Sequence, residues 1–157
     1  MLAALVAASA VAAAKPDPHR FVRTVTARHQ VALTLVAAYD GSNGGFNFDG
    51  YASGELFLSV PIGWRVVVRC ENRGPLRHSC AVVRGAGSGT PAFRGAETPQ
   101  PFLGLQAGTS ASFSFRASRR GTYRLACLVP GHEDARMWDV LDVGKTRRVV
   151  VTTRVGP

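Results

Sequence analysis

The residue types with the most chemical potential gather in one short segment near the C-terminal end of the chain. Cys127, His132 and Met137 follow one another there, with four residues between each pair. A Pro-Gly turn signal between the cysteine and the first histidine can fold the imidazole back toward the thiol. A further histidine, His78, lies upstream at the start of a predicted strand. Two imidazoles, a thiolate and a thioether are the donors of copper electron-transfer sites, where the thioether approaches weakly on the axis.

Each of these residues has an ordinary explanation when it is taken alone. Cys127 suits a small core position, His132 a surface loop, and Met137 a gap in the core. Their joint occurrence with His78, which lies on a separate predicted strand, favours a metal site instead. Zinc is the chemical competitor, but it usually takes Cys and His without a thioether. We therefore predict a copper site formed by His78, Cys127, His132 and Met137.

The elements that must position these residues are predicted to be strands. Short apolar runs, many of them rich in Val and Phe, are separated by Gly and Pro turn signals. The predicted strands cover residues 21–38 (one or two strands), 55–60, 64–70, 78–83, 110–117, 122–126, 140–143 and 148–153. Residues 84–108 lack a regular pattern, and such a long excursion is often functional. The pattern indicates an all-β fold, a sandwich or barrel of antiparallel strands.

Composition and charge limit the classes of function. The 157 residues include 46% hydrophobic and 18% charged side chains, a balance that is typical of one globular domain. Lys and Arg number 19 against 10 Asp and Glu, so the net charge is +9. The basic residues are scattered and are not interleaved with aromatic residues, which argues against nucleic-acid binding. A basic surface would still attract acidic protein partners or anionic membrane surfaces.

The N-terminus has the character of an export segment. Residues 1–14 are apolar and Ala-rich without a charged side chain, and they end in three alanines, like the cleavage site of a secretory signal. The run is shorter than the roughly 20 residues of a membrane-spanning helix, and no basic residue precedes it. A buried Ala-rich helix is the alternative. We predict a signal peptide or weak membrane anchor at 1–14, a linker at 15–20 and one domain at 21–157. These divisions place the protein outside the cytoplasm, either secreted, periplasmic or on the outer face of the cell membrane.

The other two cysteines leave two interpretations open. Cys80 lies two residues after His78, and residues two apart in an extended strand share a face, so its thiol would lie near the metal. Alternatively, Cys80 pairs with Cys70 across one loop, because an exported chain permits a disulfide.

Several stretches of the chain resemble those of a known family. The chain resembles the blue-copper cupredoxins, and most closely the sulfocyanin and rusticyanin branch. The stretches that carry the resemblance are 46–50, 60–64, 77–79, 92–99 and the ligand loop 127–138, and it extends roughly over residues 44–143. The resemblance implies a Greek-key β-sandwich and one type 1 copper. It assigns His78, Cys127 and His132 as the strong ligands and Met137 as the axial one.

One position departs from the family pattern. A glycine usually precedes the axial methionine, and here the residue is Arg136. A positive charge beside the metal would disfavour Cu(II) and so raise the reduction potential. This hypothesis fails if Arg136 points to solvent or pairs with Glu133 or Asp134.

The function that follows is one-electron transfer between extracytoplasmic redox partners, with copper cycling between Cu(I) and Cu(II) and no enzymatic step. We expect electrons to pass through the exposed edge of His132. An apolar patch is expected around that edge, although ordinary loop packing explains its residues equally well: Leu128, Val129, Pro130 and Ala135. A basic rim would steer an acidic partner. Packed aromatic residues are expected to exclude water from the site: Phe46, Phe48 and Trp138.

Three other functions fit the residues less well than electron transfer does. A copper chaperone or storage protein of the cell envelope would use thioether-rich or paired-thiol sites, yet the chain has two methionines, one of them Met1. A multicopper enzyme would need further histidine clusters, and His19 and His29 near the N-terminus form none. A metal-free binding module of the same fold does not explain the complete ligand set. No nucleic-acid partner is expected, and membrane association is expected only through the N-terminus or through partners.

Overall fold

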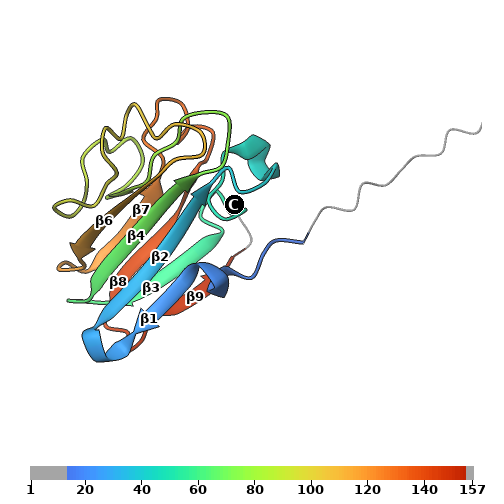
Figure 1. Cartoon of the computed structure of the whole chain (residues 1–157). Helices are drawn as coiled ribbons and strands as arrows, with labels where there is room; N and C mark the ends of the chain where they lie inside the picture. The colour runs from blue at the N-terminus through green and yellow to red at the C-terminus, as the bar shows by residue number, and fades with distance from the viewer. Residues whose placement is uncertain (1–13, 155–157) are drawn as a thin grey trace, which may run out of the picture.

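The computed structural model describes residues 14–154, which form two β-sheets. Buried and exposed side chains alternate along their strands. Strand β4 (Arg65–Asn72) is an example, because Val66 and Val68 are fully buried while Arg65 and Arg69 are exposed. Successive side chains of a strand point to opposite faces, so each sheet has one apolar face. The two apolar faces stack to form a sandwich, and the long loops gather at one end of it (Figure 1).

The first sheet has four strands and the second has five. The first runs in the order β1-β2-β4-β6, with β1 (Val22–Val25), β2 (Gln30–Ala37), β4 and β6 (Ser110–Arg116). The second runs in the order β5-β7-β8-β3-β9, with β5 (Ala81–Val83), β7 (Gly121–Ala126), β8 (Trp138–Gly144), β3 (Leu56–Pro61) and β9 (Val150–Thr153). Three short 3-10 helices complete the described chain: η1 (Pro18–Phe21), η2 (Thr26–Arg28) and η3 (Ser42–Gly45). Within residues 14–154, no helix has the length and apolar character that crossing a membrane requires.

The all-β prediction is confirmed, with a correction to strand direction. Residues 21–38 form two strands, β1 and β2, with η2 between them. The expectation of purely antiparallel strands is wrong, because β2 pairs with β4 and β3 pairs with β8 in parallel. Between β2 and β4 the chain crosses to the other sheet to form β3, and parallel neighbours require a crossover connection of this kind.

The predicted strand at 78–83 is wrong at its start, because only Ala81–Val83 forms β5. His78 instead exchanges two backbone hydrogen bonds with Leu105, at 3.3 and 2.7 Å. The Ser79 N–H donates to the Cys127 sulfur at 3.2 Å rather than to a neighbouring strand. His78 and Ser79 therefore lie in an irregular segment before β5, at the end of the sandwich where the loops gather.

The excursion of residues 84–108 lies along the outer edge of β5. The Val82 N–H donates to the Ala96 carbonyl at 2.8 Å, and the Ala92 N–H donates to the Val82 carbonyl at 2.7 Å. The Thr98 N–H continues this contact to the Cys80 carbonyl at 2.9 Å. These hydrogen bonds satisfy backbone groups that an edge strand would otherwise expose.

A disulfide joins the two sheets and decides between the two interpretations of Cys80. Cys70 in β4 is bonded to Cys80, which lies directly before β5, and their Cα atoms are 5.9 Å apart. Both residues are fully buried in the main core. Cys80 therefore has no free thiol to offer to a metal, and Cys127 is the free thiol of the described chain.

The predicted N-terminal divisions are only partly within the described residues. Residues 1–13, which carry almost all of the predicted signal or anchor, lie outside them. In the predicted linker 15–20, the Tyr51 hydroxyl donates to the Pro16 carbonyl, and η1 begins at Pro18. The boundaries of the signal, linker and domain stay predictions.

A tight hairpin turn positions the segment that precedes β3. Phe48 and Tyr51 exchange two backbone hydrogen bonds, at 2.8 and 2.7 Å, and Asp49 and Gly50 between them have φ values of 56° and 82°. Two-residue hairpin loops with positive φ at both positions favour Asp-Gly, so the turn has a local sequence cause.

Two carboxyl groups are fully buried, that of Asp49 in this turn and that of Asp139 near the start of β8. Asp49 accepts the Val36 N–H at 2.8 Å, Asp139 accepts the Leu56 N–H at 2.9 Å, and the second oxygen of each has no hydrogen-bond partner in the described chain. Burial raises the pKa of Asp49 to about 8 and raises the pKa of Asp139 well above 3.8. Between pH 4 and 8, Asp49 thus holds a proton in the folded chain and releases it in the unfolded chain. The free energy of unfolding therefore falls as the pH rises through this range.

We expect Asp49→Asn to remove this pH dependence, since an amide keeps the acceptor for Val36 and does not titrate. The free energy of unfolding of the variant, relative to the unsubstituted chain, should rise between pH 4 and 8, by at most about 1.4 kcal/mol per pH unit. Denaturant titrations at several pH values measure it. Asp142→Asn, on a half-buried carboxylate of β8, is the matched control. A relative stability that does not change with pH would contradict the prediction.

Candidate metal centre

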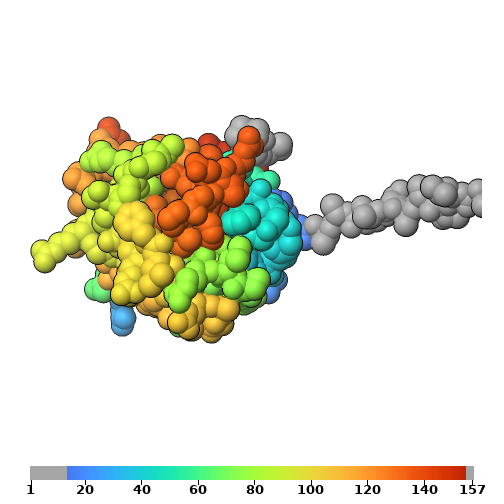
Figure 2. All heavy atoms as spheres, turned by 90° about the horizontal axis from the view of Figure 1, so that it is seen from above, coloured from blue at the N-terminus to red at the C-terminus, as the bar shows by residue number. Residues whose placement is uncertain are grey.

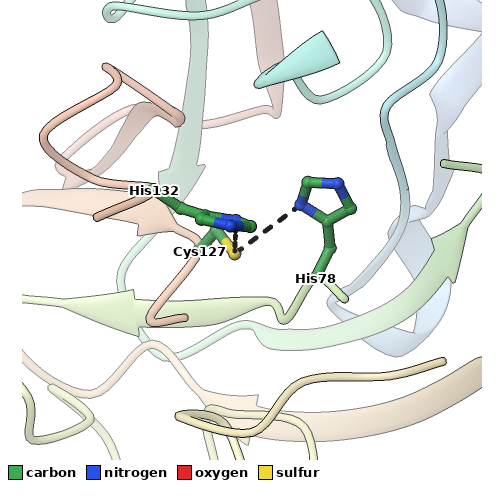
Figure 3. Close-up of side chains that lie close together, drawn as sticks. All are labelled: His78, Cys127 and His132. Atoms are coloured by element: carbon green, nitrogen blue, oxygen red, sulfur yellow. Dashed lines mark hydrogen bonds between the residues drawn. The ribbon is translucent and has the colours of Figure 1, made fainter. Parts of the chain in front are cut away.

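Three of the four predicted ligands converge at the loop end of the sandwich. The potential ligand atoms of His78, Cys127 and His132 all lie within 4.8 Å of one another, and all three residues are buried. The Cys127 sulfur is 3.3 Å from Nδ1 of His132 and 4.0 Å from Nδ1 of His78 (Figure 3). The two imidazole rings have centroids 4.8 Å apart. Residues 49 positions apart in the sequence therefore form one cluster.

The ligand loop is held by hydrogen bonds of its own backbone. Cys127 directly follows β7, and the loop leads to β8 through His132 and Met137. The His132 N–H donates to the Val129 carbonyl at 3.1 Å, as the Pro-Gly turn signal predicts. The Met137 N–H donates to the His132 carbonyl at 3.0 Å, and the Cys127 N–H donates to the Met137 carbonyl at 3.2 Å. Met137, the predicted axial ligand, is thus tied to both ligands of its loop and is fully buried.

The Cys127 thiol lies in a setting suited to a thiolate that is bound to a cation. Burial raises its pKa, while N–H groups of Ser79 and Val129 act in the opposite direction. The Ser79 hydroxyl lies 3.7 Å from the sulfur and accepts the Leu128 N–H at 2.9 Å. A buried thiol of raised pKa stays protonated alone, and a coordinated metal ion is the charge that would deprotonate it. Sequence reasoning assigned no role to Ser79, because its contact with Cys127 spans 48 positions.

The two imidazoles are in the protonation state that binds metals. Burial, with a smaller contribution from the neighbouring His132, lowers the pKa of His78 to about 4. Burial also lowers the pKa of His132. Both rings are therefore neutral at pH 7, and the neutral ring has a free lone pair for a metal.

The segment around η3 covers one side of the two imidazoles. The Phe46 ring meets the His132 ring edge to face, with centroids 4.9 Å apart, and lies 6.4 Å from the His78 ring. The Asn43 amide donates to the Ala135 carbonyl at 2.8 Å and to the Phe46 carbonyl at 2.7 Å, which joins η3 to the ligand loop. Phe46 thus lies where the sequence predicted a shielding aromatic, whereas Phe48 is fully buried in the main core.

Glu133, the neighbour of His132, connects the ligand loop to two other segments. One of its oxygens accepts from the Arg124 guanidinium at 2.7 Å, and the other accepts the Gly87 N–H at 3.0 Å. The Arg124 guanidinium also lies over the Trp138 ring, 3.9 Å from its centroid. Trp138 therefore packs against Arg124 at the end of the loop. The loop is held at both ends and in the middle, which limits how far its ligands can move.

The donor set and its surroundings fit copper. The cluster combines one thiol and two neutral imidazoles, and the loop adds a buried thioether, which is the donor set of copper electron-transfer sites. Zinc would be expected with Cys and His donors alone. Within residues 14–154, these three residues are the one group of His, Cys, Asp or Glu that could hold a metal ion.

Comparisons with known proteins identify the family of the chain. A family model described as the sulfocyanin (SoxE) domain matches residues 20–153. Sulfocyanin from Sulfolobus acidocaldarius is 30% identical over 124 residues, which cover 71% of this chain and 62% of that protein. The chain thus spans less than two thirds of the length of this relative.

Solved structures show the same fold at low identity. Reduced auracyanin from the photosynthetic bacterium Roseiflexus castenholzii superposes with a TM-score of 0.53 at 22% identity, covering 72% of this chain and 96% of that one. Variants of rusticyanin superpose with a TM-score of 0.51 at 18% identity, covering 74% of this chain and 78% of theirs. The expected cupredoxin-like sandwich is confirmed. The family match over residues 20–153 shows that the chain belongs to the sulfocyanin family, and the donor set of its site fits copper.

Proposed function

We propose that this chain carries single electrons between redox proteins outside the cytoplasm, with one type 1 copper held by His78, Cys127, His132 and Met137. The observation that carries the proposal is the convergence of one free thiol and two neutral imidazoles in a buried cluster. Copper, when bound, supplies the Cu(I)/Cu(II) couple. The remaining chemistry is that of the protein, which holds the donors in place and keeps water away.

The surroundings of the ligands suit a carrier because they resist rearrangement. Ser79 donates its N–H to the Cys127 sulfur, and its hydroxyl accepts from Leu128 on the ligand loop. Neighbouring groups of this kind orient metal ligands and tune the metal. A set of donors that stays in place in both oxidation states lowers the cost of each electron transfer.

The disulfide favours a carrier over a copper chaperone or storage protein. Proteins that hold Cu(I) for delivery use paired thiols or several thioethers. Cys70 and Cys80 are bonded to each other, so Cys127 is left as a single thiol beside two imidazoles. A multicopper enzyme would need a second metal-binding group, and the described residues contain one such group.

An apolar surface at the loop end is the proposed docking site for redox partners. His132 is 8% exposed there. Of the patch expected around it, Pro130 is exposed, Val129 is half-buried and Leu128 is buried. Three larger apolar side chains come from other loops and are each more than half exposed: Leu76, Phe102 and Leu103.

These exposed side chains lie next to the ligand segments. Phe102 lines one depression together with Val129 and Pro130. Gly104 lies so close to the backbone of His78 that an added Cβ would be 3.1 Å from it. Figure 2 shows the chain around residue 100, in yellow, on the same face as the ligand loop, in orange. A partner that covers this face would bring its cofactor near His132, and the net charge of +9 favours an acidic partner.

Arg136, where the family usually has glycine, has a backbone conformation that favours glycine. Its φ is 64°, and its side chain is exposed. Its carbonyl accepts the N–H groups of Ser53 and Trp138, both at 2.9 Å, so this conformation is held from two sides. The position therefore combines backbone strain with a positive charge one residue from Met137.

Loading with Cu(II) tests the proposed centre. We expect an intense visible band from thiolate-to-copper charge transfer, and we expect Cys127→Ser to abolish it. The double variant Cys70→Ala/Cys80→Ala keeps Cys127 as the sole thiol and should keep the band, which makes it the matched control. A colourless protein that binds only Cu(I) would instead identify a chaperone or storage site.

Electron self-exchange between oxidised and reduced copies tests the docking surface without a named partner. We expect Leu103→Lys to slow the exchange by about tenfold, because it places a charge within an apolar contact, while the visible spectrum stays the same. Ile62→Lys is the matched control, since Ile62 is 40% exposed in the turn between β3 and β4, away from the ligand loop. NMR line broadening in mixed oxidation states gives the rate, and equal slowing in both variants would reject a specific docking surface.

Two substitutions separate the charge of Arg136 from its backbone strain. Arg136→Gln removes the charge and keeps the strain, whereas Arg136→Gly removes both. Because the Arg136 side chain is exposed, solvent and salt screen its charge, and we expect neither variant to change the reduction potential measurably at physiological salt. Only Arg136→Gly should raise the free energy of unfolding, by up to about 1 kcal/mol. Voltammetry and denaturant unfolding measure the two effects, and a lower potential in both variants would show that the charge does reach the copper.

A further inference from the structure

The outer face of the first sheet has an arrangement of charge that the electron-transfer function does not require. Arg65 in β4 and Arg116 in β6 are directly opposite each other in an antiparallel pair, and both are exposed. Like charges that face each other across two strands destabilise a sheet. A negative charge bound between them would relieve this repulsion.

A third arginine completes a depression at this place. Arg94 comes from the excursion of residues 84–108 and is exposed. The lining of the depression contains no carboxylate: Arg65, Arg94, Ser114, Phe115 and Arg116. The Ser114 hydroxyl accepts from Nη2 of Arg65 at 2.9 Å, which holds that guanidinium at the edge of the depression.

No acidic side chain of the described chain neutralises these three arginines. The ion pairs of residues 14–154 use four other basic residues: Lys15, Arg69, Arg73 and Arg124. Glu71, the carboxylate on the same strand as Arg65, already pairs with Arg69 and Arg73. The three arginines thus present their donors to solvent around one hollow.

We propose that this depression is a binding site for an oxyanion of the phosphate class. A guanidinium has a planar fork of N–H donors that matches phosphate oxygens, and hydrogen bonds between charged groups are stronger than neutral ones. Three guanidinium groups around one hollow match the several oxygens and the double charge of a phosphate. The Ser114 hydroxyl keeps its own proton to donate. A bound dianion would turn the repulsion between Arg65 and Arg116 into attraction to a shared ligand.

The site lies at the opposite end of β4 from the metal centre. Arg65 begins the strand, and Asn72 ends it, where the Asn72 amide donates to the carbonyls of Leu76 and Leu105 beside His78. Seven residues at about 3.3 Å each separate the two ends. An anion in the depression would therefore leave the copper end free. Free inorganic phosphate and the phosphate of a lipid headgroup offer the same chemistry. Binding to a headgroup would place the protein on a membrane surface with its copper end facing away.

Calorimetric titration with inorganic phosphate, at ionic strength held constant with chloride, tests the site. We expect saturable binding of one phosphate per chain. Arg94→Gln and Arg116→Gln should each weaken it by about tenfold. Arg23→Gln is the matched control, because it removes one charge from an exposed position of β1 in the same sheet, outside the depression. It should leave the affinity within about twofold.

Absence of saturable binding would overturn the proposal. It would also be overturned if Arg23→Gln weakened binding as much as Arg94→Gln and Arg116→Gln, because phosphate would then be attracted only by the overall positive charge. Unfolding midpoints of the variants confirm that they fold, and the visible spectrum of the copper-loaded chain should not respond to phosphate. Sedimentation with phosphatidylcholine vesicles, with and without phosphatidic acid, separates the two sources. Binding to the acidic vesicles that needs Arg94 and is reversed by phosphate supports the headgroup, whereas phosphate binding without vesicle binding supports the free anion.

Discussion

The hydrogen bond from the Ser79 N–H to the Cys127 sulfur is the contact on which the metal centre depends. It joins the irregular segment before β5 to the end of β7 and so places the thiol between two imidazoles. The same serine accepts the Leu128 N–H, so the first turn of the ligand loop is oriented by the segment that carries His78. The upstream histidine and the downstream loop are thereby positioned by one residue that binds no metal itself.

The rest of the structure supports this contact from three directions. The disulfide between Cys70 and Cys80 ties the segment before β5 to the first sheet. Asn43 and Phe46 hold η3 against the ligand loop and cover its imidazoles. Glu133 anchors the middle of the loop to Arg124 and to the Gly87 backbone. A protein that must hold donors still while their metal changes charge needs such support, because flexible ligands would rearrange at each transfer.

The two ends of the sandwich have different chemistry, so the two proposed binding surfaces lie at opposite ends of the molecule. The metal end has exposed apolar side chains and a nearly buried histidine, which suits brief contact with other proteins. The far end of β4 has arginines without acidic partners in the described chain. A surface that bears phosphate and a redox partner would then approach from opposite ends and would not compete.

The sequence alone determined the donor types and the strand pattern, because both are local. The even spacing of Cys127, His132 and Met137 and the Pro-Gly turn between the first two define the ligand loop without reference to the rest of the chain. A run of β-branched residues likewise predicted β4, and the alternation of Ser and Phe predicted β6, each within a few residues. The resemblance to the sulfocyanin branch added the Greek-key topology and the axial role of Met137, and the family match over residues 20–153 agrees with that branch.

Only the tertiary structure decided the contacts between distant segments. Cys80 lies two residues from His78, yet it bonds to Cys70, because the segment at 78–79 leaves the strand to contact Leu105 and Cys127. The parallel pairing of β2 with β4 depends on where β3 lies, which no local pattern encodes. Arg65, Arg94 and Arg116 look scattered in the sequence and meet only when two strands and a loop are brought together. Sequence periodicity predicts on which side of a strand a side chain lies. Only the tertiary fold determines which residues of other segments it contacts.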